Sequence, residues 1–403
     1  MLDILLVIVL GLIVGTITGL IPGVHPNTII VISLPFAISY PPYSVAIFLL
    51  VTGVTHSFVT FIPSILLGAP DDSTALGVLP GHSLLLQGRG YEAIYLSVIG
   101  GLGACTFSLV TLPIFAFVVP FVYNIVRPHT HWLLIFVVAY MIFKEKNSFY
   151  GFITFALAGI LGIFSLNHMD SAALFPMLTG LFALPLLRNS YKTKTHMPEN
   201  ISFQIEKLSP RFLLSSISIG SFAGILAGLL PGVGSAQAAV LANEINNISS
   251  ETDYKKEENT RSFLISLGGI NTADIIYSIF AIILIGNPRS GIAVAISELI
   301  KISLWDAIIF SGIIFITSII AASITLNISR IAIFKLRKIN YYLLSRSTFY
   351  FLWFLIIAFS GISGLIIAFF AMLVGGLPTK LNIRRTHLMG CLILSTILFF
   401  MGI

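Results

Sequence analysis

The sequence predicts an all-α polytopic membrane protein, because hydrophobic residues dominate it, charges are rare and long apolar runs recur along it. Of its 403 residues, 57% are hydrophobic and only 9% are charged, and the mean hydropathy is +1.00. A soluble domain carries roughly 25% charged residues. We therefore expect no soluble domain of useful size, and a chain that crosses the cell membrane several times.

The apolar runs are sufficient for about ten membrane-spanning helices, at about 20 residues for each crossing. Several runs are too short or too interrupted to cross alone, so we also expect broken or re-entrant half-helices. The runs occupy residues 1–21, 27–39, 43–67, 93–126, 131–143, 150–165, 211–230, 262–286, 303–325, 349–376 and 387–403.

One unusual segment occurs twice. Residues 15–28 read GTITGLIPGVHPNT and residues 224–237 read GILAGLLPGVGSAQ, and Pro231 follows Pro22 by 209 residues. Proline lacks the amide that continues a helix, and lipid offers no water to the backbone groups it frees. A broken helix repeated in both halves of a hydrophobic chain is typical of a transporter substrate site.

Each break predicts two half-helices whose ends meet inside the membrane. A helix start presents backbone amides and the positive end of the helix dipole, so the two starts could converge on one anion, a carboxylate or a phosphate. Gly23 and Gly232 should then lie near one another. The predicted substrate-binding residues at the breaks are Pro22, Gly23, His25, Asn27, Thr28, Pro231, Gly232, Gly234, Ser235 and Gln237. For His25 the alternative is a hydrogen-bonded structural histidine.

Glycines spaced by four residues precede each break. They lie on one face of a helix and permit another helix to approach closely, so we expect them to be packing residues. They are Gly11, Gly15 and Gly19 in the first half and Gly220, Gly224 and Gly228 in the second.

The two halves continue in parallel after the breaks. TGVTHS at 52–57 precedes GAPDDS at 68–73, as GGINTA at 268–273 precedes GNPRSG at 286–291. Ordered matches of this kind indicate an internal duplication, and an odd number of spans in each half would make the repeats inverted. The predicted division is a first repeat at 1–187, a polar linker at 188–210 and a second repeat at 211–403.

Polar groups within these segments are candidates for substrate and ion binding, because ionisable residues are costly at membrane depth. Hydroxyl, amide and carboxylate oxygens suit Na⁺. The predicted substrate-binding residues are Thr55 and His56, which align with Asn271 and Thr272, and Arg289, which aligns with the acids of GAPDDS. The predicted ion-coupling residues are Asp71, Asp72, Asn271, Thr272 and Asp274. The alternatives are a solvated loop for Asp71 and Asp72, and interhelical hydrogen bonds for the others.

Several function classes are excluded by what the sequence lacks. It contains no phosphate-binding G-x-x-x-x-G-K-[ST] motif and no H-E-x-x-H or serine elbow, so we expect neither an ATPase nor an enzyme. The net charge of +6 comes from scattered loop residues, which fits a membrane protein better than a nucleic-acid partner. Cys105 and Cys391 lie in apolar runs and are expected to be buried and unpaired. The only expected cofactor is a coupling ion, Na⁺ or H⁺.

The chain resembles the TctA family, the large membrane subunits of tripartite tricarboxylate transporters, in its archaeal branch. The resemblance is carried by the repeated G-x-x-x-G-x-x-P-G segment at 15–23 and 224–232, and by residues 65–93 with their Pro80-Gly81 and Gln87-Gly88-Arg89 turns. It implies a secondary transporter that takes up carboxylates with a cation gradient, beside a small membrane subunit and an extracytoplasmic binding protein. It also implies that both Pro-Gly pairs line the substrate site.

Two other readings stay open at this stage. The I-P-G-V segment also resembles that of the polyprenyl-phosphate translocases, whose lipid substrate presents an anionic head to the same helix ends. A reading from another class is a membrane scaffold or an intramembrane enzyme, which predicts neither a duplication nor a central cavity.

Overall fold

The structure is a computed structural model that describes residues 2–21, 40–69, 72–169, 173–192, 202–205, 207–230, 234–246, 253–336 and 341–402. These residues form helices joined by short turns and contain no strand. The predicted all-α class is therefore confirmed.

The helices are given in chain order. They are α1 (Leu2–Leu20), α3 (Pro42–Val59), α4 (Phe61–Leu67), α5 (Val78–Leu86), α6 (Gly90–Val126), α7 (Thr130–Phe143), α8 (Ser148–Met169), α9 (Leu174–Leu178), α10 (Leu184–Lys192), α11 (Pro210–Leu229), α12 (Ser235–Asn246), α13 (Asp253–Ile285), α14 (Gly291–Leu299), α15 (Leu304–Leu336), α16 (Tyr341–Gly375), α17 (Leu377–Leu381) and α18 (Gly390–Met401).

Seven described segments are long and apolar enough to cross a bilayer, and five shorter apolar helices accompany them. This agrees with the expected mixture of complete spans and shorter pieces, and the chain is a multi-pass membrane protein. The seven long segments are Pro42–Leu67, Gly90–Val126, Ser148–Met169, Pro210–Leu229, Glu257–Ile285, Leu304–Lys335 and Ser345–Leu381.

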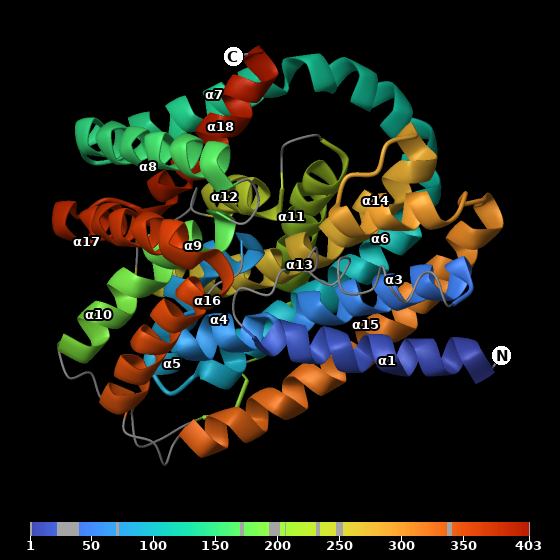
Figure 1. Ribbon diagram of the computed structural model, residues 1–403, viewed down its shortest axis with the longest axis horizontal. Helices are drawn as coiled ribbons and strands as arrows, with labels where there is room; N and C mark the ends of the chain where they lie inside the picture. Colours follow the sequence, from blue (N-terminus) through green and yellow to red (C-terminus); the bar gives the residue numbers. More distant parts are fainter. Residues whose placement is uncertain are drawn as a thin grey trace.

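The helices pack into two groups, one that extends from the lower left of Figure 1 across its centre to the right and one at its left and upper left. The first group contains α1, α3 to α6, α11 and α13 to α15, and the second contains α7 to α10 and α16 to α18. Helix α6, which has Pro113 and Pro120 within it, arches over the top of the view and leads the chain from one group to the other. Helix α12 lies in the centre and contacts α11 and α13 in the first group and α18 in the second.

Two irregular backbone segments occur in the second group. Residues Thr179–Ala183 form a π-helical turn between α9 and α10, and α16 is broken at Gly361, whose φ is 61° and ψ is −156°. Residues with a Cβ atom rarely adopt this backbone conformation, so glycine is required at this break. Both irregularities lie in the elements that pack α16 against α9 and α10.

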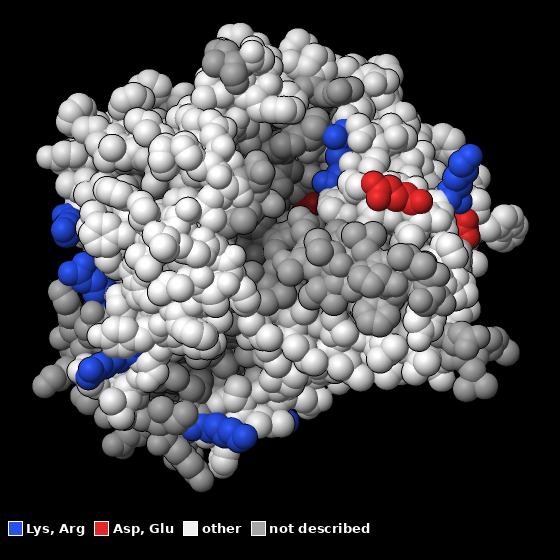
Figure 2. Space-filling view, viewed as in Figure 1, with Lys and Arg blue, Asp and Glu red and all other residues white. Residues whose placement is uncertain are grey.

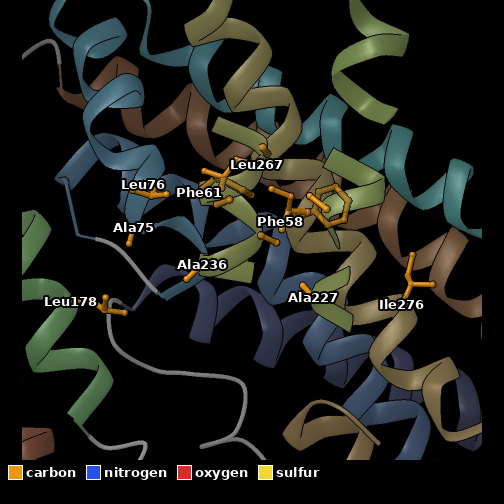
Figure 3. Packing of buried hydrophobic residues seen from close by; sticks show 14 of the residues in the cluster. Phe58, Phe61, Ala75, Leu76, Leu178, Ala227, Ala236, Leu267 and Ile276 are labelled. Carbon is orange, nitrogen blue, oxygen red and sulfur yellow. The ribbon is translucent and has the colours of Figure 1, made fainter. Parts of the chain in front are cut away.

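The buried core continues from the first group into α12. Figure 3 shows Phe58, Phe61 and Leu267 within this cluster, with Ala236 of α12 nearby. Cys105 and Cys391 are both buried and free, as predicted. Large apolar side chains such as Phe117 and Ile362 are 87% and 78% exposed, and Figure 2 shows few charged side chains on the face in view. A surface of this kind suits lipid.

The predicted glycine faces are contact surfaces. A Cβ atom added to Gly15 of α1 would lie 2.6 Å from the carbonyl oxygen of Thr52 in α3, and one added to Gly224 of α11 would lie 2.8 Å from that of Ile270 in α13. Real Cβ atoms essentially never come so close to backbone oxygen. Only glycine allows α1 to lie on α3, and α11 on α13, at this distance.

Substitution of Gly224 by alanine should therefore destabilise the protein by about 1–3 kcal/mol, the usual cost of overpacking. The matched control is Gly312→Ala in α15, where a Cβ would meet nothing within 4 Å. That substitution should be neutral or stabilise the helix by up to about 1 kcal/mol. Thermal unfolding of the purified protein in detergent measures both effects. Equal melting temperatures for the two variants would contradict the close contact of α11 with α13.

Candidate functional site

The two glycine faces dock in the same register, and this places two ionisable residues at equivalent positions. Gly19, the last glycine of α1, lies against the carbonyl of His56, and Gly228, the last glycine of α11, lies against that of Asp274. Asp274 follows His56 by 218 residues. The other glycine contacts have the same spacing: Gly11 with Phe48 and Gly220 with Ser266, and Gly15 with Thr52 and Gly224 with Ile270.

This register differs by two residues from the alignment made on the sequence. The sequence motifs paired Thr55 and His56 with Asn271 and Thr272, whereas the helix contacts pair His56 with Asp274. The helices α1 and α11 end at Leu20 and Leu229, two residues before Pro22 and Pro231. Each ionisable residue therefore lies beside the end of a helix that stops within the apolar part of the chain.

Asp274 lies in the middle third of the long α13 span, and its carboxylate is bound by two serines. The hydroxyl of Ser235 donates to Asp274 Oδ2 at 2.5 Å, and that of Ser278 donates to Oδ1 at 3.1 Å. Ser235 is the first residue of α12, so the carboxylate lies at the positive end of that helix. Asp274 thus occupies a position that suits an anion.

The start of α12 is also stabilised by its own residues. The amide of Gly234 donates to Gln237 Oε1 at 3.0 Å, which is the reach-back half of a capping box. Gln237 was predicted to bind substrate, and the structure places its side chain in this cap. Ser235 lies beside Asp274 at the helix start.

In the first half, His56 is 4% exposed and its Nδ1 lies 3.2 Å from Thr18 Oγ1 of α1. Its neighbour Thr55 donates its hydroxyl to the Val51 carbonyl one turn earlier at 2.8 Å. Thr55 therefore satisfies its hydroxyl within its own helix, while His56 faces α1 at the level of the last glycine.

Asn271 and Thr272 lie where α13 crosses α3 and α6. The Asn271 amide donates to the Ser57 carbonyl of α3 at 3.2 Å, and Thr272 lies with Phe58 against Gly101 of α6. Both are buried. Ser57 adjoins His56 and Asn271 is one turn from Asp274, so the crossing brings the two ionisable positions to the same region of the first group.

The remaining predicted residues lie elsewhere or outside the described part of the chain. Arg289, between α13 and α14, donates to the hydroxyl of Tyr123 in α6 and its guanidinium lies 5.1 Å from the Tyr123 ring centroid. Asp72 begins the 3-10 turn Asp72–Gly77. The predictions for Pro22, Gly23, His25, Asn27, Thr28, Asp71, Pro231 and Gly232 lie outside the described residues.

Sequence reasoning missed a buried charge network that joins α12 to the second helix group. Arg384 donates to Glu145 Oε2 at 3.1 Å, to Glu244 Oε1 at 2.7 Å and to the Met141 carbonyl at 2.9 Å. His387, which is 0% exposed, adds a bond to Glu145 at 2.9 Å. The only sequence signal was an isolated acid beside an apolar run. Three separate segments, α12, the α7–α8 turn and the chain before α18, meet here.

A second network ties the start of α6 to α13. Arg89 makes two hydrogen bonds to Glu92, at 2.7 and 2.9 Å, and a third to Glu257. Arg261 pairs with the same two acids at 3.1 and 3.3 Å. Arg89 belongs to the Gln-Gly-Arg turn of the family resemblance, and in this fold it connects helices.

The ion pair of Glu145 with Arg384 should make the stability of the protein depend on pH. Burial raises the pKa of Glu145, but hydrogen bonds from His387 and Arg384 outweigh it and hold that pKa below the ordinary value of 4.5. A carboxyl whose pKa is lower when folded stabilises the protein fully above its unfolded pKa, and this contribution is lost as the pH falls through the folded value. Glu145→Gln should therefore melt several degrees below the wild type at pH 7, with a difference that shrinks below about pH 4.5.

The matched control is Glu298→Gln, since Glu298 is exposed on α14. Melting temperatures measured between pH 7 and pH 3 should separate the two. A difference between wild type and Glu145→Gln that stays constant over this range would rule out the paired carboxylate.

Comparison with known proteins agrees with the resemblance found in the sequence. Residues 5–390 match the model of the family described as the tripartite tricarboxylate transporter TctA family. The chain is also 35% identical over 394 residues to an uncharacterized protein of Methanocaldococcus jannaschii, and the alignment covers 94% of each chain. This relative is archaeal, as the predicted branch is. No solved structure matches the chain.

Proposed function

This chain belongs to the tripartite tricarboxylate transporter TctA family, and on that premise we propose that it is a secondary active transporter that moves a carboxylate-type anion by alternating access, coupled to H⁺ or Na⁺. The family places it as a transporter membrane subunit. The proposal of cation-coupled anion transport is supported by the position of the Asp274 carboxylate, at the start of α12 and beside the end of α11.

Asp274 supplies the coupling in this proposal. Its carboxylate is bound by Ser235 at 2.5 Å and so lies where a substrate carboxylate would bind the α12 start. Two carboxylates that share such a site repel each other strongly. A proton or Na⁺ that neutralises Asp274 removes this repulsion, so cation binding favours anion binding and the reverse holds equally.

The two-group architecture supports alternating access. Helix α12 contacts both groups, so a change at its start can be transmitted to their interface. The first group carries the glycine-packed helix pairs, which resist deformation because their backbones are in contact. Glycine contacts of the same kind occur within the second group, where Gly162 lies against Cys391 and Gly375 against Leu181. We therefore assign the movement to α12 and to the contact between two internally rigid groups.

The family also suggests the partners. TctA proteins work in tripartite systems with a small membrane subunit and a binding protein, and we propose that this chain delivers its substrate with equivalent partners. The described surface of the second group exposes large apolar side chains such as Phe136 and Phe143, at 73% and 81% exposure, which are compatible with lipid or with another membrane subunit.

The test is uptake of labelled citrate into proteoliposomes, with and without an imposed H⁺ or Na⁺ gradient. Wild-type uptake should be stimulated by one of the gradients, whereas Asp274→Asn, which cannot exchange a proton or offer a charged oxygen to Na⁺, should lose that stimulation about tenfold or more. Glu298→Gln, which removes an exposed acid on α14, is the matched control and should behave as wild type.

Gradient stimulation that is unchanged in Asp274→Asn would contradict the coupling role. If no labelled tricarboxylate or dicarboxylate enters in any gradient, with or without a co-reconstituted small subunit and binding protein, the transport proposal itself fails.

A further inference from the structure

A cavity of about 750 Å³ lies at the contact between the two helix groups, far from Asp274. It is lined by the turn before α5 and α5 itself, by α12 and the beginning of α13, and by the segment 378–386 between α16 and α18. Pockets of this size hold small metabolites. Asn259 lines it and precedes Asp274 by 15 residues on α13, which at 1.5 Å per residue separates the two places by about 22 Å.

Two adjacent arginines line the cavity, and their electrostatic situations differ. Arg384 is paired with Glu145 and Glu244 in the buried network. Arg385 is half-buried and donates to the Thr379 hydroxyl at 3.2 Å. Within the described ranges, no carboxylate lies in ion-pair distance of Arg385. A partly buried cation with a neutral partner is costly unless an anion accompanies it.

Buried polar atoms without a partner lie in the same wall. Thr386 is 6% exposed, and its hydroxyl makes no hydrogen bond. The amide nitrogen of Asn259 is also buried and makes none. Native proteins rarely leave such atoms unsatisfied. Both residues line the cavity that Arg385 lines, so a cation and two hydrogen-bonding groups without partners share one space.

We propose that this cavity is a second anion site, which binds a carboxylate of the transported solute through Arg385, with Asn259 and Thr386 as hydrogen-bonding partners. The solute class rests on the proposed transport function. Arg384 is a positioning residue here, because its bonds to Glu145, Glu244 and Met141 fix the backbone from which Arg385 and Thr386 extend. The site lies at the beginning of α13, as expected of a vestibule through which the solute passes before or after Asp274.

The test needs a readout that is local to the cavity, because citrate would also bind at the transport site. Cys105 and Cys391 are buried, so a cysteine introduced at Leu79, which lines the cavity and is 43% exposed, can be labelled selectively. The experiment measures the rate of maleimide labelling of purified, full-length Leu79→Cys as citrate is added, with inorganic phosphate and acetate as separate arms.

Citrate should slow the labelling in a saturable manner, and at lower concentration than phosphate or acetate. Adding Arg385→Gln should raise the citrate concentration for half-protection about tenfold or more, and Thr386→Val should raise it by less. The matched control is Lys380→Gln, which removes a nearby exposed charge outside the cavity lining. It should leave protection unchanged. Arg385→Lys, which keeps the positive charge, should retain part of the protection by citrate.

The proposal is overturned if citrate does not protect Leu79→Cys, if phosphate protects as well as citrate, or if Arg385→Gln and Lys380→Gln give the same protection. These results are distinguishable from failure of the transport function. If the protein transports citrate in proteoliposomes but Arg385→Gln does not change the protection of Leu79→Cys, the transport function stands and this second site is ruled out. If citrate protects Leu79→Cys through Arg385 but the protein transports no carboxylate, the anion site stands and the transport function is ruled out.

Discussion

The contact between bare backbones at the two glycine faces is the constraint on which the rest of this structure depends. Between helices in lipid the hydrophobic effect gives no advantage, so close packing of small residues must supply the attraction. Each glycine of α1 or α11 has one carbonyl of α3 or α13 opposite it, and this fixes both the rotation and the sliding of the pair. The last glycine then determines which residue lies beside the end of the broken helix.

That residue is ionisable in both halves, but its chemistry differs. His56 lies against Thr18 in the first half, and Asp274 is bound by Ser235 and Ser278 in the second. The same helix packing thus presents an imidazole at one position and a carboxylate at the equivalent one.

The contact between α12 and the second helix group has a different basis, because it is made by charges as well as apolar side chains. The Arg384 network joins α12 to the turn after α7 and to the segment before α18, so breaking it would leave buried charges unpaired. Arg385 extends from the same backbone without a carboxylate partner among the described residues. The hydrogen bonds of Arg384 thus hold in place the segment that carries Arg385.

The local sequence predicted the all-α membrane class, the helix ends before Pro22 and Pro231, and the glycine faces, since composition, proline chemistry and helical period are local properties. It also indicated Asp274 and Ser235 separately. Only the tertiary structure joined them in one hydrogen bond, shifted the repeat register by two residues to pair His56 with Asp274, and brought Glu145 to Arg384. The physical reason is that an alignment compares residue identities, whereas register and ion pairs depend on which backbones touch and which helix ends meet.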